Sequence, residues 1–113
     1  MSVDSLHQEI ESLIAKHPVL LFMKGTADFP ACGFSNLVVQ VLDQFNVPFQ
    51  YVDILDRADL RQAIKDYTNW PTLPQLYING TFIGGADIVR EMYMDGTFET
   101  LLREQGFLNE AAE

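Results

Sequence analysis

The feature that most restricts the fold is a short, unbroken run of apolar residues, Val19-Leu20-Leu21-Phe22-Met23, which ends at Lys24-Gly25. A strand with one face in water alternates apolar and polar residues, so a strand without alternation is buried on both faces. Burial on both faces requires helices that cover a sheet from either side. We therefore expect an α/β protein.

Helical periodicity on both sides of this run supplies the covering helices. A first helix ends at His17-Pro18, because the residue before a proline disfavours the α conformation, and a second ends shortly before Pro48. Three further helical patterns begin near Asp56–Asp59, near Asp87 and near Phe98. We expect the Asp56–Asp59 segment and Asp87 to supply helix caps.

Three more strands are expected, from Phe49 to Ile54, from Gln75 to Ile78 and from Thr81 to Ile83. Asn79-Gly80 between the last two is the strongest short-range signal for a tight β-hairpin, so this pair should be antiparallel. A right-handed crossover through a helix makes the first two strands parallel. The sequence therefore predicts a four-stranded mixed sheet flanked by about five helices.

Length and charge exclude several classes of protein. With 113 residues and no linker or repeat, we expect a single domain over 1–113, with a frayed tail at 109–113. A net charge of −9 disfavours binding to nucleic acid or to an anionic membrane. No apolar run approaches the roughly 20 residues that span a bilayer, and the polar N-terminus does not resemble a secretory signal. We expect a cytoplasmic protein.

Cys32 is the single cysteine of the chain, so no internal disulfide can form. It lies in a turn between a buried strand and a helix, where free backbone N–H groups and the helix dipole stabilise a thiolate, and we expect its pKa to be lowered. Ser35 occupies the position of a second cysteine in a Cys-x-x-Cys pair, which excludes a dithiol cycle within one chain. Three uses of the sulfur remain open: a mixed disulfide with an external thiol, a bond to metal, and redox sensing by oxidation.

The stretch Trp70-Pro71-Thr72-Leu73-Pro74 has two explanations. Two prolines just before a strand can simply mark its start. Alternatively, Pro74 follows a cis peptide bond and presents the backbone groups of Leu73 to a peptide-like ligand.

The charged candidates are equally ambiguous when each is taken alone. Asp87 is either a helix cap or a carboxylate that receives a ligand ammonium group. Arg61 and Lys65 on the third helix are most simply solvated charges. Lys24 could be no more than a charge that solubilises the end of a strand. In an acidic chain, however, an anionic ligand needs local cations such as Lys24 and Arg61.

Taken together, four motifs resemble one family: Lys24, Cys32–Ser35, Trp70–Gln75 and Gly84–Ile88. In this order they are similar to those of the monothiol, CGFS-containing glutaredoxins, and in particular of the bacterial single-domain members of glutaredoxin-4 type. The resemblance extends from about Leu6 to Arg103. It implies a thioredoxin-like fold, which agrees with the mixed sheet expected above.

The resemblance also implies a ligand, glutathione, and a cargo, a two-iron, two-sulfur (2Fe-2S) cluster. Cys32 would be both the catalytic and the metal-binding residue, because it would ligate the cluster or form a mixed disulfide with glutathione. The cofactor-binding residues that the family implies are Lys24, Gly33, Phe34, Arg61, Thr72, Leu73, Pro74, Ala86 and Asp87.

Individual roles follow from the same resemblance. Lys24 and Arg61 would hold the glycyl carboxylate of glutathione, and Leu73 would pair with its cysteinyl backbone. Ala86 and Asp87 would receive the γ-glutamyl end, so that each charged end of the tripeptide meets an opposite charge. Many relatives carry a cysteine at the position of Ala86, and any redox behaviour that needs this second thiol is ruled out here.

Three functions are therefore compared. The first, which the resemblance favours, is an iron-sulfur carrier: a homodimer bridged by the cluster, which delivers it to apo-proteins and pairs with a BolA-like protein. The second is a glutathione-dependent thiol-disulfide oxidoreductase acting through Cys32, expected at most as a weak activity. The third is a thioredoxin-like binding module without chemistry.

Overall fold

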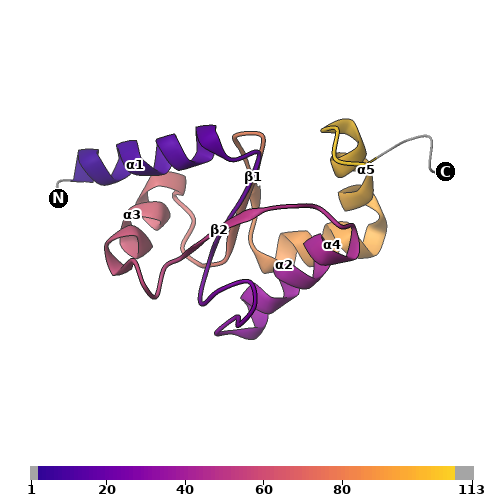
Figure 1. Ribbon diagram of the computed structural model, residues 1–113, viewed down its shortest axis with the longest axis horizontal. Helices are drawn as coiled ribbons and strands as arrows, with labels where there is room; N and C mark the ends of the chain where they lie inside the picture. The colour runs from indigo at the N-terminus through magenta and orange to yellow at the C-terminus, as the bar shows by residue number, and fades with distance from the viewer. Residues whose placement is uncertain (1–2, 109–113) are drawn as a thin grey trace.

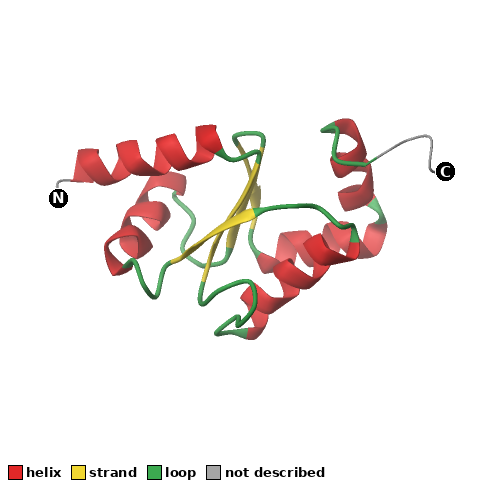
Figure 2. Ribbon diagram, in the orientation of Figure 1, coloured by secondary structure: helices red, strands yellow, loops and turns green. Residues whose placement is uncertain are grey.

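The computed structural model describes residues 3–108, and its helices and strands follow one another in the order expected from the sequence (Figure 1, Figure 2). The predicted fraying of residues 109–113 lies outside the described residues. The described part of the chain contains five helices and four strands: α1 (Val3–Lys16), β1 (Val19–Met23), α2 (Gly33–Gln44), β2 (Gln50–Asp53), α3 (Ala58–Thr68), β3 (Gln75–Ile78), β4 (Thr81–Gly84), α4 (Ala86–Asp95) and α5 (Thr97–Glu104).

The strands form one mixed sheet in the order β2-β1-β3-β4. β1 pairs with β2 in parallel and with β3 in antiparallel orientation, and β3 and β4 form the antiparallel hairpin around Asn79-Gly80. The predicted strand directions are thus confirmed. β1 is an inner strand with all of its residues buried, which explains why its sequence does not alternate.

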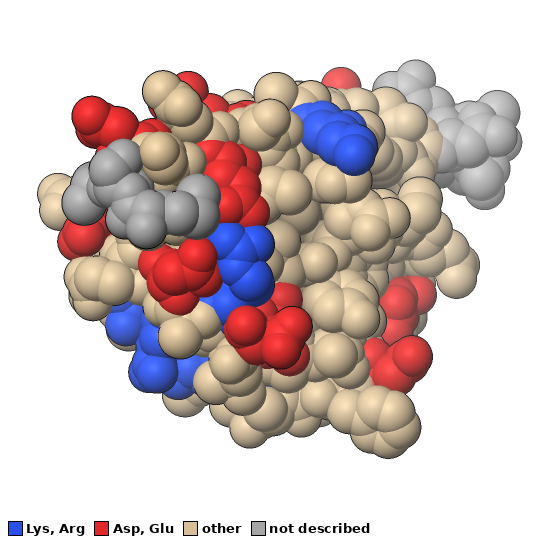
Figure 3. Space-filling view, turned by 60° about the vertical axis from the view of Figure 1, so that its left-hand side comes forward, with Lys and Arg blue, Asp and Glu red and all other residues tan. Residues whose placement is uncertain are grey.

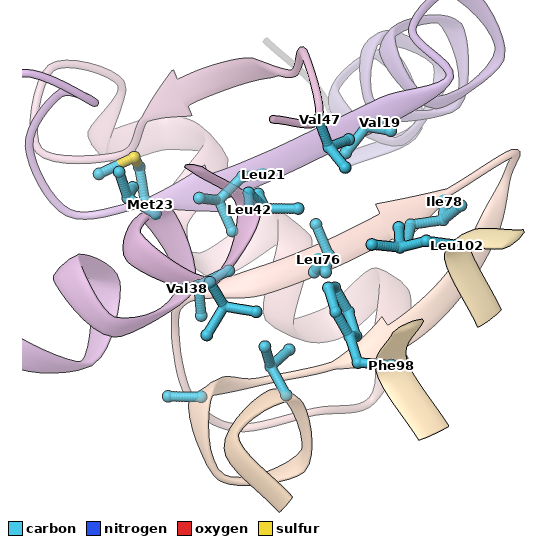
Figure 4. Close-up of a cluster of buried hydrophobic side chains, with 14 residues drawn as sticks. Val19, Leu21, Met23, Val38, Leu42, Val47, Leu76, Ile78, Phe98 and Leu102 are labelled. Atoms are coloured by element: carbon cyan, nitrogen blue, oxygen red, sulfur yellow. The ribbon is translucent and has the colours of Figure 1, made fainter. Parts of the chain in front are cut away.

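Alternate side chains of β1 enter two separate cores. Val19, Leu21 and Met23 belong to the core formed with α2, α4 and α5 (Figure 4). Leu20 and Phe22 belong to the core formed with α1 and α3. Figure 1 shows the resulting layers, with α1 and α3 on one side of the sheet and α2, α4 and α5 on the other.

An ion-pair network joins α1 to the start of α3. Arg57 donates hydrogen bonds to both carboxylate oxygens of Glu9, at 2.7 and 2.9 Å, and it also pairs with Asp59 at 3.0 Å. Acidic and basic side chains interleave on this face of the molecule (Figure 3). The hydrogen bonds from Arg57 hold the pKa values of Glu9 and Asp59 below their ordinary range.

Of the helix caps expected from the sequence, Asp87 is wrong, whereas the cap of α3 lies inside the expected Asp56–Asp59 segment. α4 is capped by Gly85, without a side-chain hydrogen bond, and Asp87 lies inside the first turn. α3 is capped by Arg57, again without a side-chain bond, because a guanidinium has no acceptor for a backbone N–H; it donates instead to the Asp59 carboxylate. Asp87 is exposed, so its carboxylate remains available for a ligand.

Candidate functional site

Cys32 is the N-terminal cap of α2, as the sequence predicted. Its backbone is extended (φ −149°, ψ 157°), and its carbonyl accepts the N–H of Asn36 at 3.0 Å, which starts the helix. Its sulfur accepts the N–H of Ser35 at 3.4 Å. The side chain is half-buried, so the sulfur is held by the helix start while a reactant can still approach it.

The loop between β1 and α2 places Cys32 relative to the sheet. The two ends of the loop are joined by a hydrogen bond from the Ala31 N–H to the Lys24 carbonyl at 2.9 Å, and Gly25 turns the chain with φ +89°. A Cβ on Gly25 would lie 2.5 Å from the Ala31 nitrogen and 2.6 Å from the Phe29 oxygen, so only glycine fits. The Asp53 carboxylate at the end of β2 accepts the Gly25 N–H at 2.9 Å and ties the loop to the sheet.

Ser35 is the buried partner of the Cys32 sulfur. Its hydroxyl oxygen lies 3.4 Å from Cys32 Sγ and accepts the backbone N–H of Lys24 at 3.1 Å. Partial burial is the largest influence on the thiol pKa and raises it, but the hydrogen bonds from the Ser35 side chain and backbone, the Phe34 N–H and the charge of Lys24 together outweigh it. The pKa of Cys32 is therefore lowered, as predicted, and the thiolate is favoured.

A cleft of about 310 Å³ opens beside the start of α2. Its walls are largely apolar, while two lysines and one aspartate supply charges of opposite sign. The lining residues come from the position just after β1, from α2, α3, the loop before β3 and the start of α4: Lys24, Phe34, Lys65, Trp70, Pro71, Thr72, Leu73, Pro74, Gly85, Ala86, Asp87 and Ile88.

The loop before β3 forms one wall of this cleft. Gln75, which is fully buried, donates from Nε2 to the carbonyls of Trp70 at 3.3 Å and Thr72 at 3.1 Å, and so fixes the loop from inside. The Leu73–Pro74 peptide bond is cis, in agreement with the second of the two explanations that the sequence offered for this stretch. A Cβ on Gly85 would lie 3.1 Å from the Pro74 oxygen, so this glycine lets the start of α4 pack closely against the loop.

Most of the cofactor-binding residues expected from the sequence line this one cleft. Lys24 and Phe34 come from the Cys32 side of the cleft, and Asp87 comes from α4. Thr72, Leu73, Pro74 and Ala86 also line it. Gly33 and Arg61 are exposed and are not among the lining residues, although Gly33 follows Cys32 directly.

Lys65 is a cleft residue to which sequence reasoning gave no role. It is half-buried and lines the cleft, one helical turn after Arg61 on α3. In residues 3–108, neither Lys24 nor Lys65 has a carboxylate within salt-bridge distance. The i, i+4 spacing of Arg61 and Lys65 was the available signal, because it places both cations on one helix face.

A metal site made by the chain alone is absent from the described residues. Within 3–108, no three side chains of His, Cys, Asp or Glu gather closely enough to hold a metal ion. Over the same range, no helix has the length and apolar character needed to cross a membrane.

Comparison with known proteins identifies the family. The glutaredoxin family model matches residues 19–83, more than half of the chain. A ycf64-like monothiol glutaredoxin of Synechocystis sp. is 50% identical over 93 residues, which cover 82% of this chain and 87% of that protein. The chain belongs to the monothiol glutaredoxins.

Solved structures agree with this glutaredoxin in fold. Reduced poplar apo GrxS14, solved in solution, is 46% identical and superposes with a TM-score of 0.80, covering 93% of this chain and 97% of the poplar chain. A buckwheat glutaredoxin in complex with glutathione is 26% identical, with a TM-score of 0.81, covering 95% of this chain and 96% of the buckwheat chain. The thioredoxin-like fold expected from the sequence is confirmed.

Proposed function

We propose that the cleft of this glutaredoxin binds glutathione. The tripeptide carries two carboxylates and an ammonium group, and the cleft offers Lys24 and Lys65 for a carboxylate and Asp87 for the ammonium group. Arg61, one turn from Lys65, adds positive charge at longer range. The buckwheat glutaredoxin, which shares the fold, is complexed with glutathione and supports this ligand.

We further propose that this glutaredoxin carries a 2Fe-2S cluster as cargo. A cluster with all-thiolate ligation needs four sulfur ligands, and each chain has one cysteine. Two chains that each supply Cys32, with two glutathione molecules that each supply a thiolate, complete the set. Ser35 cannot replace a thiolate, because a neutral hydroxyl is a poor ligand for a soft metal centre.

The observation that carries this proposal is the position of Cys32 beside a cleft with glutathione-like charge complementarity, in a chain with no second thiol. The holo form is then a homodimer joined by the cluster, and its partners are apo-proteins that accept the cluster and a BolA-like protein. A reducing compartment such as the cytoplasm keeps both thiols available.

Anaerobic reconstitution with iron, sulfide and glutathione tests the carrier function. The wild type should develop the visible absorption of a 2Fe-2S cluster, and the Cys32→Ser variant should stay colourless. Ser12→Ala, a change at an exposed site on α1, is the control and should match the wild type. A coloured Cys32→Ser variant would show that the cluster has other ligands.

The hydrogen bonds to the Cys32 sulfur also support a second candidate, thiol-disulfide exchange. A glutathione thiolate attacks the glutathione sulfur of a Cys32–glutathione mixed disulfide, one S–S bond forms as another breaks, and Cys32 leaves as a thiolate while oxidised glutathione is released. A leaving thiol with a low pKa speeds this step. Reduction of a glutathionylated peptide, followed through release of oxidised glutathione, tests this activity.

A further inference from the structure

One carboxylate reaches from the end of β2 to the loop that follows β1. Asp53 is the last residue of β2 and lies opposite Met23, the last residue of β1. Its Oδ1 accepts the N–H of Gly25 at 2.9 Å and the N–H of Leu55 at 2.9 Å. Asp53 is not among the residues that line the cleft. The carboxylate therefore joins the ends of two strands from a position outside the cleft.

The side chain of Asp53 acts where the backbone of β2 has turned away from β1. Ile54 N–H still donates to the Met23 carbonyl at 2.9 Å. The N–H groups of Asp56 and Arg57 then both donate to the Asp53 carbonyl at 3.1 Å, which turns the chain toward α3. Gly25 is a buried residue, and a buried N–H without a partner is costly. The Asp53 carboxylate supplies the partner that β2 no longer provides.

The peptide that Asp53 holds is the one that carries Lys24 into the cleft. Lys24 N–H donates to the Ser35 hydroxyl at 3.1 Å, and the Lys24 carbonyl accepts the Ala31 N–H at 2.9 Å. These two partners belong to α2 and to the loop before it. The bond from Gly25 to Asp53 ties the same peptide to the sheet. Without this tie, the peptide can shift together with the loop, and the Lys24 side chain starts from a different place.

We propose that Asp53 is a positioning residue for glutathione, which holds Lys24 where its ammonium group meets a glutathione carboxylate. The role rests on the proposed binding of glutathione in the cleft, to which it adds a residue that does not contact the ligand. Asp53 acts only through the Lys24–Gly25 peptide.

The sign of the effect separates positioning from simple electrostatics. Glutathione has two carboxylates and one ammonium group, so its net charge is negative, and the chain has a net charge of −9. By charge alone, removal of a carboxylate from this chain should strengthen glutathione binding. Loss of the Asp53 carboxylate should instead weaken it, because the position of Lys24 is lost.

Calorimetric titration of the apo protein with glutathione tests this role. Asp53→Ala should raise the dissociation constant about three- to ten-fold. Asp53→Asn keeps an oxygen that can accept both N–H groups, so it should bind within about two-fold of the wild type. Asp56→Ala removes an equal charge from an exposed side chain three residues away and is the matched control, which should bind no more weakly than the wild type.

A fourth variant keeps the charge and moves the acceptor. Asp53→Glu retains the carboxylate on a side chain that is one methylene longer, so its oxygen no longer meets the Gly25 N–H in the same place. It should also weaken glutathione binding, and it provides the measurement if Asp53→Ala does not fold.

A double-mutant cycle separates positioning from general destabilisation. If Asp53 acts through Lys24, Asp53→Ala should cause less than about a two-fold further loss of affinity when it is added to Lys24→Ala. Independent effects would multiply instead. Glu9→Gln, which breaks the ion pair with Arg57 on the α1 side of the molecule, is the stability control and should bind glutathione like the wild type.

The outcomes distinguish this role from the proposed function of the cleft. A wild type that does not bind glutathione would overturn both. If the wild type binds and Lys24→Ala binds more weakly, the positioning role alone fails in either of two cases. In the first, Asp53→Ala and Asp53→Glu bind as tightly as the wild type. In the second, the losses from Asp53→Ala and Lys24→Ala multiply in full.

Discussion

The hydroxyl oxygen of Ser35 lies 3.4 Å from the sulfur of Cys32 and is completely buried. This oxygen already accepts the Lys24 N–H, so the hydroxyl proton of Ser35 can be donated to the sulfur. A thiolate accepts this hydrogen bond more strongly than a thiol does. The residue that replaces a second cysteine in the motif is therefore a hydrogen-bonding partner of the first. The presence of serine at position 35 therefore both excludes an internal disulfide and stabilises the Cys32 thiolate.

We expect the alkylation rate of apo Cys32 to rise with pH at a midpoint below the ordinary range of a cysteine thiol. Ser35→Ala should move this midpoint upward, because it removes one donor to the thiolate, while Ser12→Ala should not. Since the folded-state pKa is the lower one, the thiolate stabilises the fold above the unfolded pKa, and this contribution is lost as pH falls through the folded pKa. Equal midpoints for Ser35→Ala and the wild type would contradict the role of Ser35.

Gly25→Ala should destabilise the protein and disturb Cys32. The added Cβ would meet the Ala31 nitrogen at 2.5 Å, at a φ of +89°. Gly80→Ala is a matched control with φ +82° and no atom within 4 Å, so it should cost only the conformational strain, about 1–2 kcal/mol. Urea unfolding should show that Gly25→Ala costs at least about 1 kcal/mol more. Equal losses for the two variants would show that the loop yields without strain.

Lys65→Ala should weaken glutathione binding by roughly three- to ten-fold, because it removes a half-buried cation from the cleft. Arg61→Ala should weaken it less, since Arg61 is exposed and acts at longer range. Lys16→Ala removes an equal charge at the end of α1, which precedes the opposite end of β1, and should have the smallest effect. Calorimetric titration orders the three variants. A larger effect of Arg61→Ala than of Lys65→Ala would mean that Arg61, and not Lys65, contacts the glutathione carboxylate.

Glu9→Gln should lower stability near neutral pH by a few tenths to about 1 kcal/mol, because it breaks the contact with Arg57. The folded-state pKa of Glu9 is depressed, so the carboxylate stabilises the fold above its unfolded pKa of about 4.3 and loses this effect as pH falls through the folded pKa. The difference between variant and wild type should therefore shrink below about pH 4. A difference that stays constant with pH would mean that packing, not charge, is lost.

The elements that could be predicted are those in which local pattern and burial agree. The unbroken apolar run of β1 requires two covered faces, and Asn79-Gly80 requires a hairpin, so the mixed sheet followed directly. Cys32 was correctly placed at a helix start because a turn and a helical pattern meet there.

The relationships that escaped prediction depend on tertiary distance. Lys65 lines the cleft and Arg61 does not, although both lie on one helix face, because Lys65 is one turn nearer to the end of α3 that leads into the cleft-lining loop at Trp70. Periodicity gives the face of a helix but not the point along the helix at which a cleft opens. The Asp53 carboxylate binds Gly25 across 28 positions of sequence, and no local signal indicates such a pair. Asp87 was expected to cap α4, but the cap lies two residues earlier, at Gly85, which packs against Pro74.

The central claim is that two chains and two glutathione molecules share one cluster. The most direct measurement is the quantification of iron, sulfide and glutathione in the anaerobically reconstituted species, together with its mass by sedimentation. The account predicts a dimer with two irons, two sulfides and two glutathiones, and a monomeric apo protein. A cluster-loaded monomer, or a stable cluster without glutathione or a substitute thiol, would contradict it.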